Sequence, residues 1–358
     1  MNQKLKHRLF AAIPSVVALV IAGLFVYGRS RPLGGVDLNQ RAWEASYLER
    51  NKPIPPQGPR EGFWGSRIRR KARDELLGWR EPPVVVPGLL EIDEDGVQHR
   101  TSGAADPHQI MILGGSVAFG AYSSAIDTTY FHLLGKELER ALTAANLHIV
   151  AGGAWKSEQE LKAFGRLGPG FRPDLTIFLN GLNDIVNGST SRSRYGQVVP
   201  TLDGRRWSVT YHVHDYDQRV RDYLDNMAEA ARLATSLGSD LLIVLQPSLL
   251  ERAQPTATER DLMRAALLPH PSAEALTSSY EALRRGLTKL AQSPGVHFLD
   301  ASRCLQDERA TTFADLWHFS DFGHEILAKE MARRVIPILE ARRARRSGVV
   351  ETTPTAHR

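Results

Sequence analysis

A serine among glycines is the first residue whose type and setting suggest chemistry. Ser116 lies in the segment Gly-Gly-Ser-Val-Ala-Phe-Gly at residues 114–120. A serine at a glycine-rich turn after a strand exposes its hydroxyl, and its own N–H can donate to an oxyanion that develops on a substrate. The spacing of these glycines matches neither a P-loop nor a dinucleotide-binding fingerprint. Ser116 is therefore a candidate nucleophile, although a glycine-rich turn also serves close packing alone.

Three further segments carry polar residues or glycines that suit a reaction site. They are Gly-Gly-Ala-Trp-Lys-Ser at residues 152–157, Asn-Gly-Leu-Asn-Asp at 180–184 and Asp-Leu-Trp-His at 315–318. Each has an ordinary structural interpretation by itself, because glycines form turns, an asparagine caps a helix and a lone histidine packs in a core. Their meaning depends on where the fold puts them.

The elements that position these segments follow from the apolar pattern. Short apolar runs predict strands at residues 110–113, 147–150, 175–179, 241–245 and 296–299. Helical patterns lie at about residues 130–144, 157–167, 219–237, 273–291 and 320–346. Continuous apolar strands that alternate with helices predict a parallel sheet covered on both faces. We therefore expect an α/β fold, a three-layer α/β/α sandwich with a five-stranded parallel sheet, and a ligand site outside the carboxyl ends of its strands.

In this order and at these strand ends, the four segments resemble the SGNH hydrolase superfamily, also called the GDSL esterase/lipase family. The resemblance covers residues 109–340 and implies a flavodoxin-like SGNH fold. It also implies a catalytic triad with Ser116 as nucleophile, His318 as general base and Asp315 as the acid that orients the histidine. One position departs from the pattern, because the family often has Asp immediately before the serine, where this chain has Gly115.

The resemblance further implies an oxyanion hole. Its donors would be the N–H groups of Ser116 and Gly153 and the side-chain amide of Asn183. The alignment of the second segment is loose, so Gly152 and Ala154 remain alternatives to Gly153.

The activity implied by this resemblance is serine esterase chemistry. An imidazole fixed by a carboxylate would activate the hydroxyl of Ser116, and an acyl-enzyme would form and then be attacked by water. Two alternatives stay open: an O-acyltransferase that passes the acyl group to a polysaccharide, and a non-catalytic envelope or carbohydrate-binding protein that retains the fold. The esterase mechanism requires neither a cofactor nor a metal ion.

The formal net charge of +5 comes from the two ends of the chain. Residues 1–31 carry five basic residues and no acidic one, and residues 341–358 carry five arginines against Glu351. The body between them, residues 32–340, has 35 basic and 39 acidic residues, a net charge of −4. We therefore expect no nucleic-acid partner, because the globular part lacks a basic balance.

The amino-terminal segment has the features of a membrane anchor. Residues 9–28 contain no charged side chain, and this length suffices to cross roughly 30 Å of hydrocarbon as a helix. Three basic residues precede the run and two follow it, which favours a cytoplasmic amino terminus. We expect an uncleaved, single-pass signal anchor with the catalytic domain in the periplasm or outside the cell, and a cleaved signal peptide is the alternative. This location and the substrates typical of the family favour a small-molecule or polysaccharide ester as substrate. We expect a small acyl group on a carbohydrate or envelope component.

The chain divides into four parts on these grounds. Residues 1–31 form a cytoplasmic stub and the transmembrane anchor, and 32–106 a proline-rich stalk or cap. Residues 107–346 form the SGNH hydrolase domain, and 347–358 a disordered basic tail. The single cysteine, Cys304, excludes an internal disulfide and a cysteine-based zinc site.

Several other residues have side chains that suit a functional site, but the sequence gives weaker support for such a role. His-Val-His-Asp at residues 212–215 has metal-ligand side chains at close spacing, yet no third and fourth ligands can be named. We interpret His324 as a packing residue rather than the base. Trp155 and Trp317 flank the expected site, where they either pack in the core or form a wall against the substrate. Gln246 lies either at the pocket rim or in a turn.

Overall fold

The computed structural model describes residues 34–56, 58–59, 72–86, 90–141, 143–187, 198–200, 207–209, 216–265 and 273–346. The expected membrane span at residues 9–28 and the expected tail at 347–358 lie outside these ranges, so both stay predictions. Within the described ranges, no helix combines the length and the apolar character that a bilayer crossing requires.

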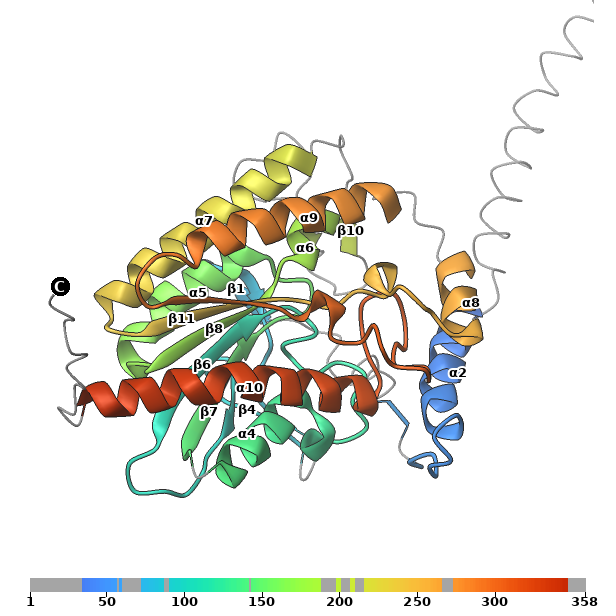
Figure 1. The fold of residues 1–358 in the computed structure, drawn as a ribbon, viewed down its shortest axis with the longest axis horizontal. Helices are drawn as coiled ribbons and strands as arrows, with labels where there is room; N and C mark the ends of the chain where they lie inside the picture. Colours follow the sequence, from blue (N-terminus) through green and yellow to red (C-terminus); the bar gives the residue numbers. More distant parts are fainter. Residues whose placement is uncertain are drawn as a thin grey trace, which may run out of the picture.

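A six-stranded sheet forms the centre of the described chain (Figure 1). Its order is β12-β11-β8-β6-β7-β5. The strands are β5 (Val97–Arg100), β6 (His108–Gly114), β7 (Ala145–Ala151), β8 (Leu175–Asn180), β11 (Asp240–Leu245) and β12 (Val296–Asp300). All neighbours pair in parallel except β5, which pairs antiparallel with β7. This mostly parallel sheet confirms the expected α/β class.

Alternate side chains of β6 supply two separate cores, one on each face of the sheet. Ile110 and Ile112 belong to one core, and Met111 and Leu113 belong to the other. Helices α4 (Tyr130–Arg140) and α10 (Asp321–Arg346) pack on the first face, and α5 (Ser157–Phe171), α7 (Tyr216–Ser236) and α9 (Ala273–Leu290) pack on the second (Figure 1). The continuous apolar runs are therefore buried on both faces, as three layers require.

The structure corrects the expected number of strands from five to six. The additional strand, β5, lies at the edge of the sheet. It belongs to residues 32–106, the expected proline-rich stalk or cap, which we call the lead-in. Val97 and Gln98 of this strand are buried, whereas His99 is exposed. An edge strand with one solvated face has no continuous apolar run, so the pattern that identified the other five strands did not identify this one.

The lead-in also contributes a helix and two hairpins. They are α2 (Gly34–Leu48), β1 (Ala72–Asp74) with β2 (Gly78–Arg80), and β3 (Val84–Val86) with β4 (Leu90–Ile92). Trp43 of α2 and Trp79 of β2 are both buried, so the helix and the first hairpin pack on the α/β domain. Short elements complete the described chain: η1 (Ile126–Thr128), α6 (Leu182–Asn187), β9 (Val198–Pro200), β10 (Trp207–Val209), η2 (Leu249–Glu251), α8 (Ala257–Ala265) and η3 (Ala301–Arg303).

The arginines at the end of α10 bind two buried aspartates near the amino ends of strands. Nε of Arg342 lies 2.8 Å from Oδ1 of Asp174, which Arg346 also contacts. Arg345 lies 2.7 Å from Oδ2 of Asp240. Burial by itself would raise the pKa of Asp174, but hydrogen bonds and the arginines outweigh it and hold that pKa well below its usual range. The basic end of α10 thus closes the amino-terminal edge of the sheet.

Candidate active site

The side chains of Ser116, His318 and Asp315 form one continuous hydrogen-bonded chain. Oγ of Ser116 lies 2.7 Å from Nε2 of His318, and Nδ1 of His318 lies 2.8 Å from Oδ2 of Asp315. Because a carboxylate only accepts, Nδ1 carries the hydrogen and donates it to Asp315, which leaves Nε2 to accept from the serine hydroxyl. This arrangement can remove a proton from Ser116.

The loop that precedes α10 presents the acid and the base together. Oδ1 of Asp315 accepts hydrogen bonds from the backbone N–H groups of Trp317 at 2.7 Å and His318 at 2.8 Å. A β-bridge between Phe313 and Phe319 closes the loop. Burial by itself would raise the pKa of Asp315, but the adjacent His318 charge and these hydrogen bonds hold it below the ordinary value. Asp315 is therefore kept as a carboxylate.

The turn after β6 leaves Ser116 partly exposed. The N–H of Ala121 donates to the Ser116 carbonyl at 3.1 Å, and no described residue accepts a hydrogen bond from the N–H of Ser116. A Cβ on Gly115 would lie 2.5 Å from Nδ2 of Asn183, a distance that real Cβ contacts do not reach. In this arrangement an aspartate at position 115, which the family often has there, would displace Asn183.

Asn183 lies at the start of α6, just after β8, with its side chain directed at the nucleophile turn. Its Nδ2 donates a hydrogen bond to the Trp155 carbonyl at 2.8 Å. A side-chain amide nitrogen carries two hydrogens, so this bond leaves one N–H for a second acceptor. The close approach to Gly115 puts this N–H beside the turn that carries Ser116.

The loop after β7 places Gly153 differently from the sequence-based expectation. The N–H of Gly153 donates to Oε1 of Glu81 at 3.2 Å. Its neighbours Gly152 and Trp155 donate to backbone carbonyls at 3.2 and 3.0 Å. The N–H of Ala154 has no hydrogen-bond acceptor among the residues that the structure describes, and Ala154 has a left-handed backbone with φ +64°. Of these four positions, Ala154 is the one with an available donor.

A buried polar network lies beneath these loops. Asp184 accepts hydrogen bonds from the Ser157 hydroxyl at 2.5 Å and from the Ser157 N–H at 3.2 Å. Asn180 donates to Glu160 and accepts from the Tyr223 hydroxyl at 2.7 Å. Burial raises the pKa of Asp184 to about 6 although the bonds from Ser157 oppose the shift. Sequence analysis missed these pairs, since nothing in the pattern shows that polar residues on separate elements meet in the interior.

His324 lies next to the site but does not contact the nucleophile. Its Nε2 lies 3.0 Å from the Ala121 carbonyl, and the side chain is fully buried. This position agrees with a packing role that supports the nucleophile turn, whereas His318 contacts Ser116.

Two of the other candidates also support backbone segments. Trp155 is buried, and its Nε1 donates to the Trp79 carbonyl at 3.0 Å, which favours core packing over a substrate wall. Nε2 of Gln246 lies 3.5 Å from the Trp317 carbonyl. Trp317 itself is partly buried beside His318.

Tyr122 is a site residue that sequence analysis missed. Its ring stacks on the imidazole of His318, with ring centroids 5.2 Å apart and planes inclined by 26°. Its backbone is left-handed, with φ +65°. No periodicity or motif distinguishes a tyrosine in a turn, so only the folded arrangement identifies it.

The expected metal-ligand candidates at residues 212–215 lie outside the described residues. Among the described residues, no group of three or more His, Cys, Asp or Glu side chains is arranged to hold a metal ion. Burial raises the pKa of the Cys304 thiol to about 12.

Comparison with solved structures finds distant likenesses. A family 3 carbohydrate esterase from Clostridium thermocellum is 15% identical with a TM-score of 0.42, over 66% of this chain and 98% of that one. A lipase/acylhydrolase from Enterococcus faecalis is 14% identical with a TM-score of 0.41, over 64% and 96%. The acetylxylan esterase Axe2 from Geobacillus stearothermophilus is 14% identical with a TM-score of 0.40, over 66% and 96%. No curated protein sequence matches the chain.

The sequence profile of the GDSL-like Lipase/Acylhydrolase family matches residues 112–326. This interval is more than half of the 358 residues. It runs from β6 into α10 and contains Ser116, Asn183, Asp315 and His318. The chain therefore belongs to the GDSL-like lipase/acylhydrolase family.

Proposed function

We propose that this chain is a serine ester hydrolase that forms an acyl-enzyme on Ser116. The observation that carries the proposal is the unbroken contact from Ser116 through His318 to Asp315, with distances of 2.7 and 2.8 Å. A serine hydroxyl is a weak nucleophile unless an oriented base removes its proton. Membership in an acylhydrolase family supports the same class of reaction.

The reaction then follows from the positions of the protons. Nε2 of His318 takes the proton of Ser116 while Oγ attacks the ester carbonyl, and Asp315 stabilises the imidazolium that results. The imidazolium returns the proton to the leaving alcohol as the ester bond breaks. Water, activated by the same imidazole, attacks the acyl-enzyme and releases the acid.

Three donors would stabilise the tetrahedral oxyanion. They are the N–H of Ser116, the remaining side-chain N–H of Asn183 and the N–H of Ala154. We favour Ala154 over the initially expected Gly153, because the N–H of Gly153 already donates to Glu81. Removal of one such donor typically reduces kcat by about 10²- to 10³-fold.

As substrate we propose a small acyl ester on a carbohydrate or envelope component outside the cytoplasm. The support is the uncharged run at residues 9–28 behind a basic amino terminus. A reporter that is active only in the periplasm, fused after Arg31, tests the location. Activity of a cytoplasm-dependent reporter at the same site would overturn it.

A fluorophosphonate probe and two esters test the chemistry. The full chain should be labelled covalently at Ser116 and should hydrolyse p-nitrophenyl acetate and acetylated sugars, whereas Ser116→Ala and His318→Ala should not. Ser236→Ala is the matched control, because Ser236 is exposed and its hydroxyl bonds only within α7. Equal turnover by the wild type and both site variants would contradict the proposal, and a folded but unlabelled protein would point to binding alone.

A second measurement separates hydrolysis from transfer. Products are analysed with and without an added sugar acceptor. Free acid as the main product in both cases supports the hydrolase, and an acylated acceptor would identify a transferase with the same acyl-enzyme.

A further inference from the structure

We propose that helix α2 of the lead-in is a positioning element of the active site, and that it acts on His318 through Tyr122. The inference rests on the proposed esterase function for its kinetic readout.

The first step is the contact between Tyr122 and the base. The Tyr122 ring covers the imidazole of His318 at a centroid separation of 5.2 Å, and Tyr122 is 6% exposed. Such a stack restricts the ring orientation of the histidine. Both the hydrogen bond that Nδ1 donates and the one that Nε2 accepts depend on that orientation. Tyr122 therefore acts on the reaction through His318 rather than on the substrate.

The second step is that Tyr122 needs an external restraint. Its φ of +65° lies in the left-handed region, which is unfavourable for a residue with a bulky side chain. A residue keeps such a conformation only when its surroundings hold it.

Helix α2 supplies this restraint at two atoms. Nε1 of Trp43 donates to the Tyr122 carbonyl at 3.1 Å, and Trp43 is fully buried. Nδ2 of Asn39 donates to the Tyr122 hydroxyl at 3.0 Å. One contact fixes the backbone and the other fixes the end of the ring, so α2 determines where the ring meets His318.

The carboxyl end of the same helix also contacts the base loop, the segment from Thr311 to Asp321 that contains His318. Glu49, the residue directly after α2, accepts hydrogen bonds from the N–H of Thr311 at 2.6 Å and from the Thr311 hydroxyl at 2.9 Å. Tyr47 donates to Asp321, which also accepts from the N–H of Ser124 at 2.7 Å. Thus α2 contacts both the nucleophile turn and the segment from Thr311 to Asp321 that contains Asp315 and His318.

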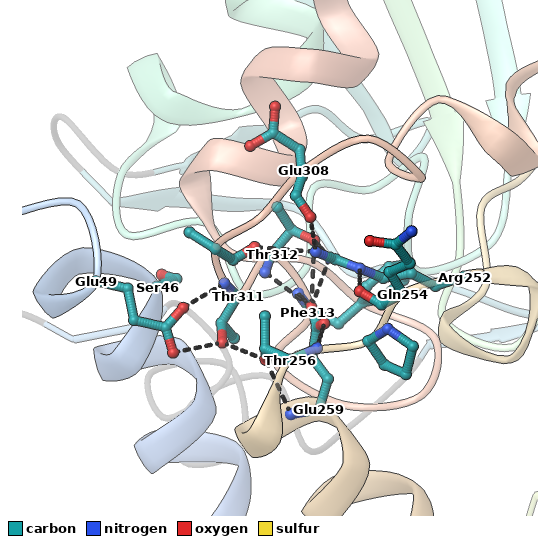
Figure 2. A network of polar contacts seen from close by, with 12 residues as sticks. Ser46, Glu49, Arg252, Gln254, Thr256, Glu259, Glu308, Thr311, Thr312 and Phe313 are labelled. Atoms are coloured by element: carbon teal, nitrogen blue, oxygen red, sulfur yellow. Dashed lines mark hydrogen bonds and ion pairs between the residues drawn. The ribbon is translucent and has the colours of Figure 1, made fainter.

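Figure 2 shows how far this anchoring extends. The Thr311 hydroxyl, bound by Glu49, lies 2.8 Å from the Thr256 hydroxyl at the start of α8. Glu259 of α8 accepts from the N–H of Thr312 at 3.0 Å and forms a buried ion pair with Arg252 at 2.8 Å. The start of the base loop therefore lies between the end of α2 and the start of α8 (Figure 2). Of these two helices, α2 is the one with a described hydrogen bond to the nucleophile turn, from Trp43 to Tyr122.

Kinetics of the full chain test the positioning role. Tyr122→Ala should lower kcat for p-nitrophenyl acetate roughly ten-fold, the size of an aromatic contact converted to a rate, and leave KM within about two-fold because no substrate contact is lost. Tyr122→Phe should restore most of the lost kcat, since the ring remains. Trp43→Phe should lower kcat in the wild-type background but not in the Tyr122→Ala background.

Gln40→Ala is the matched control, because Gln40 neighbours Asn39 on α2 and bonds to Glu44 of the same helix. Gln40→Ala should leave the kcat of the wild type unchanged. When it is added to Tyr122→Ala, the double variant should have the same kcat as Tyr122→Ala alone. A purely structural role would lower the melting temperature of the Trp43 and Tyr122 variants without a change in kcat below the transition, and that result would overturn the proposal.

Nuclear magnetic resonance of the histidine ring protons gives a readout that does not depend on catalysis. The resonance of His318, identified by its loss in His318→Gln, should be displaced by the ring current of Tyr122. It should move in Tyr122→Ala, Trp43→Phe and Asn39→Ala but not in Gln40→Ala. An unchanged resonance in all variants would overturn the positioning role even if the chain is an esterase, and a moving resonance in a chain without Ser116-dependent hydrolysis would overturn only the proposed function.

Discussion

The carboxylate of Glu81 accepts a hydrogen bond from the backbone N–H of Gly153 at 3.2 Å. Glu81 follows β2 of the lead-in, whereas Gly153 lies in the loop after β7, next to the proposed oxyanion site. Trp79 reinforces the contact, because its Nε1 donates to the Gly153 carbonyl at 3.2 Å. The lead-in therefore fixes both the N–H and the carbonyl of this glycine, and with them the direction of the neighbouring Ala154 N–H.

Substitution at Glu81 should consequently affect kcat although Glu81 has no role in the proton transfers. Glu81→Ala removes the acceptor and should lower kcat about ten-fold through misplacement of the loop, whereas Glu81→Gln keeps an oxygen acceptor and should lose much less. The measurement is steady-state hydrolysis of p-nitrophenyl acetate together with thermal unfolding. If Glu81→Ala kept the kcat of the wild type, the loop would hold its shape without the lead-in.

Three of the four chemistry-bearing segments were predictable from the apolar pattern because each follows a predicted strand, whereas the segment from Asp315 to His318 precedes α10. The strands that end before Ser116 and Asn183 are continuous apolar segments, and parallel strands bring their carboxyl ends to one edge. The pattern therefore predicted that the polar residues after these strands would meet, and the family resemblance added Asp315 and His318.

The parts contributed by the lead-in were not predictable in the same way. β5 is an edge strand with a solvated face, and Glu81 lies in the connection between β2 and β3, where no periodicity exists. Tyr122, which the lead-in contacts, lies in a turn after β6 that has no periodicity either. Their roles come from contacts between residues far apart in sequence, such as Trp43 with Tyr122. The choice between Gly153 and Ala154 likewise depends on which N–H is already bonded, and a sequence carries no information on that.

Gly115→Ala should abolish most activity without loss of the fold. The added Cβ would lie 2.5 Å from Nδ2 of Asn183, so the amide that faces the oxyanion has to move, and kcat should fall by about 10²-fold. Gly165→Ala is the control, because its Cβ would meet only Leu233 at 3.9 Å. This helical position should gain about 0.5–1 kcal/mol of stability and keep its activity. Wild-type turnover by Gly115→Ala would show that Asn183 has room to adjust.

Asn183→Ala should lower kcat by about 10²- to 10³-fold with little change in KM, because the amide N–H that does not bond to the Trp155 carbonyl is proposed to donate to the oxyanion of the transition state and not to the bound substrate. Asn146→Ala removes an amide near the amino end of β7, at the opposite end of that strand from the loop that contains Gly153 and Ala154. Its oxygen accepts from the N–H of Ser102 at 3.0 Å, and the substitution should leave kcat unchanged. Equal effects of the two variants would mean that Asn183 contributes to stability alone.

Asp174 should make the fold sensitive to acid. Its pKa is held well below the usual range in the folded state, so its contribution to stability is complete above the unfolded value of about 3.9. That contribution is lost as the pH falls below this value toward the folded pKa. Asp174→Asn should lower the free energy of unfolding by about 3 kcal/mol at pH 7, since it removes the buried carboxylate that Arg342 and Arg346 contact. The difference from the wild type, measured by denaturant titration, should shrink below pH 4, and a difference independent of pH would contradict the assignment.

Asp184 should have the opposite dependence on pH. Burial raises its pKa to about 6 in the folded state, above an unfolded value near 3.9, so the folded state binds more protons between these values. The contribution to stability is therefore complete below pH 4 and is lost as the pH rises through 6. Asp184→Asn keeps an oxygen acceptor for Ser157 and removes the titration, so the slope of unfolding free energy against pH between 4 and 6 should become less negative than in the wild type. The comparison is made by denaturant titration at constant ionic strength, and identical slopes for the two proteins would mean that Asp184 stays charged in the folded state. Because Ser157 begins α5 directly after the loop that contains Gly153 and Ala154, protonation of Asp184 links the stability of that loop to pH.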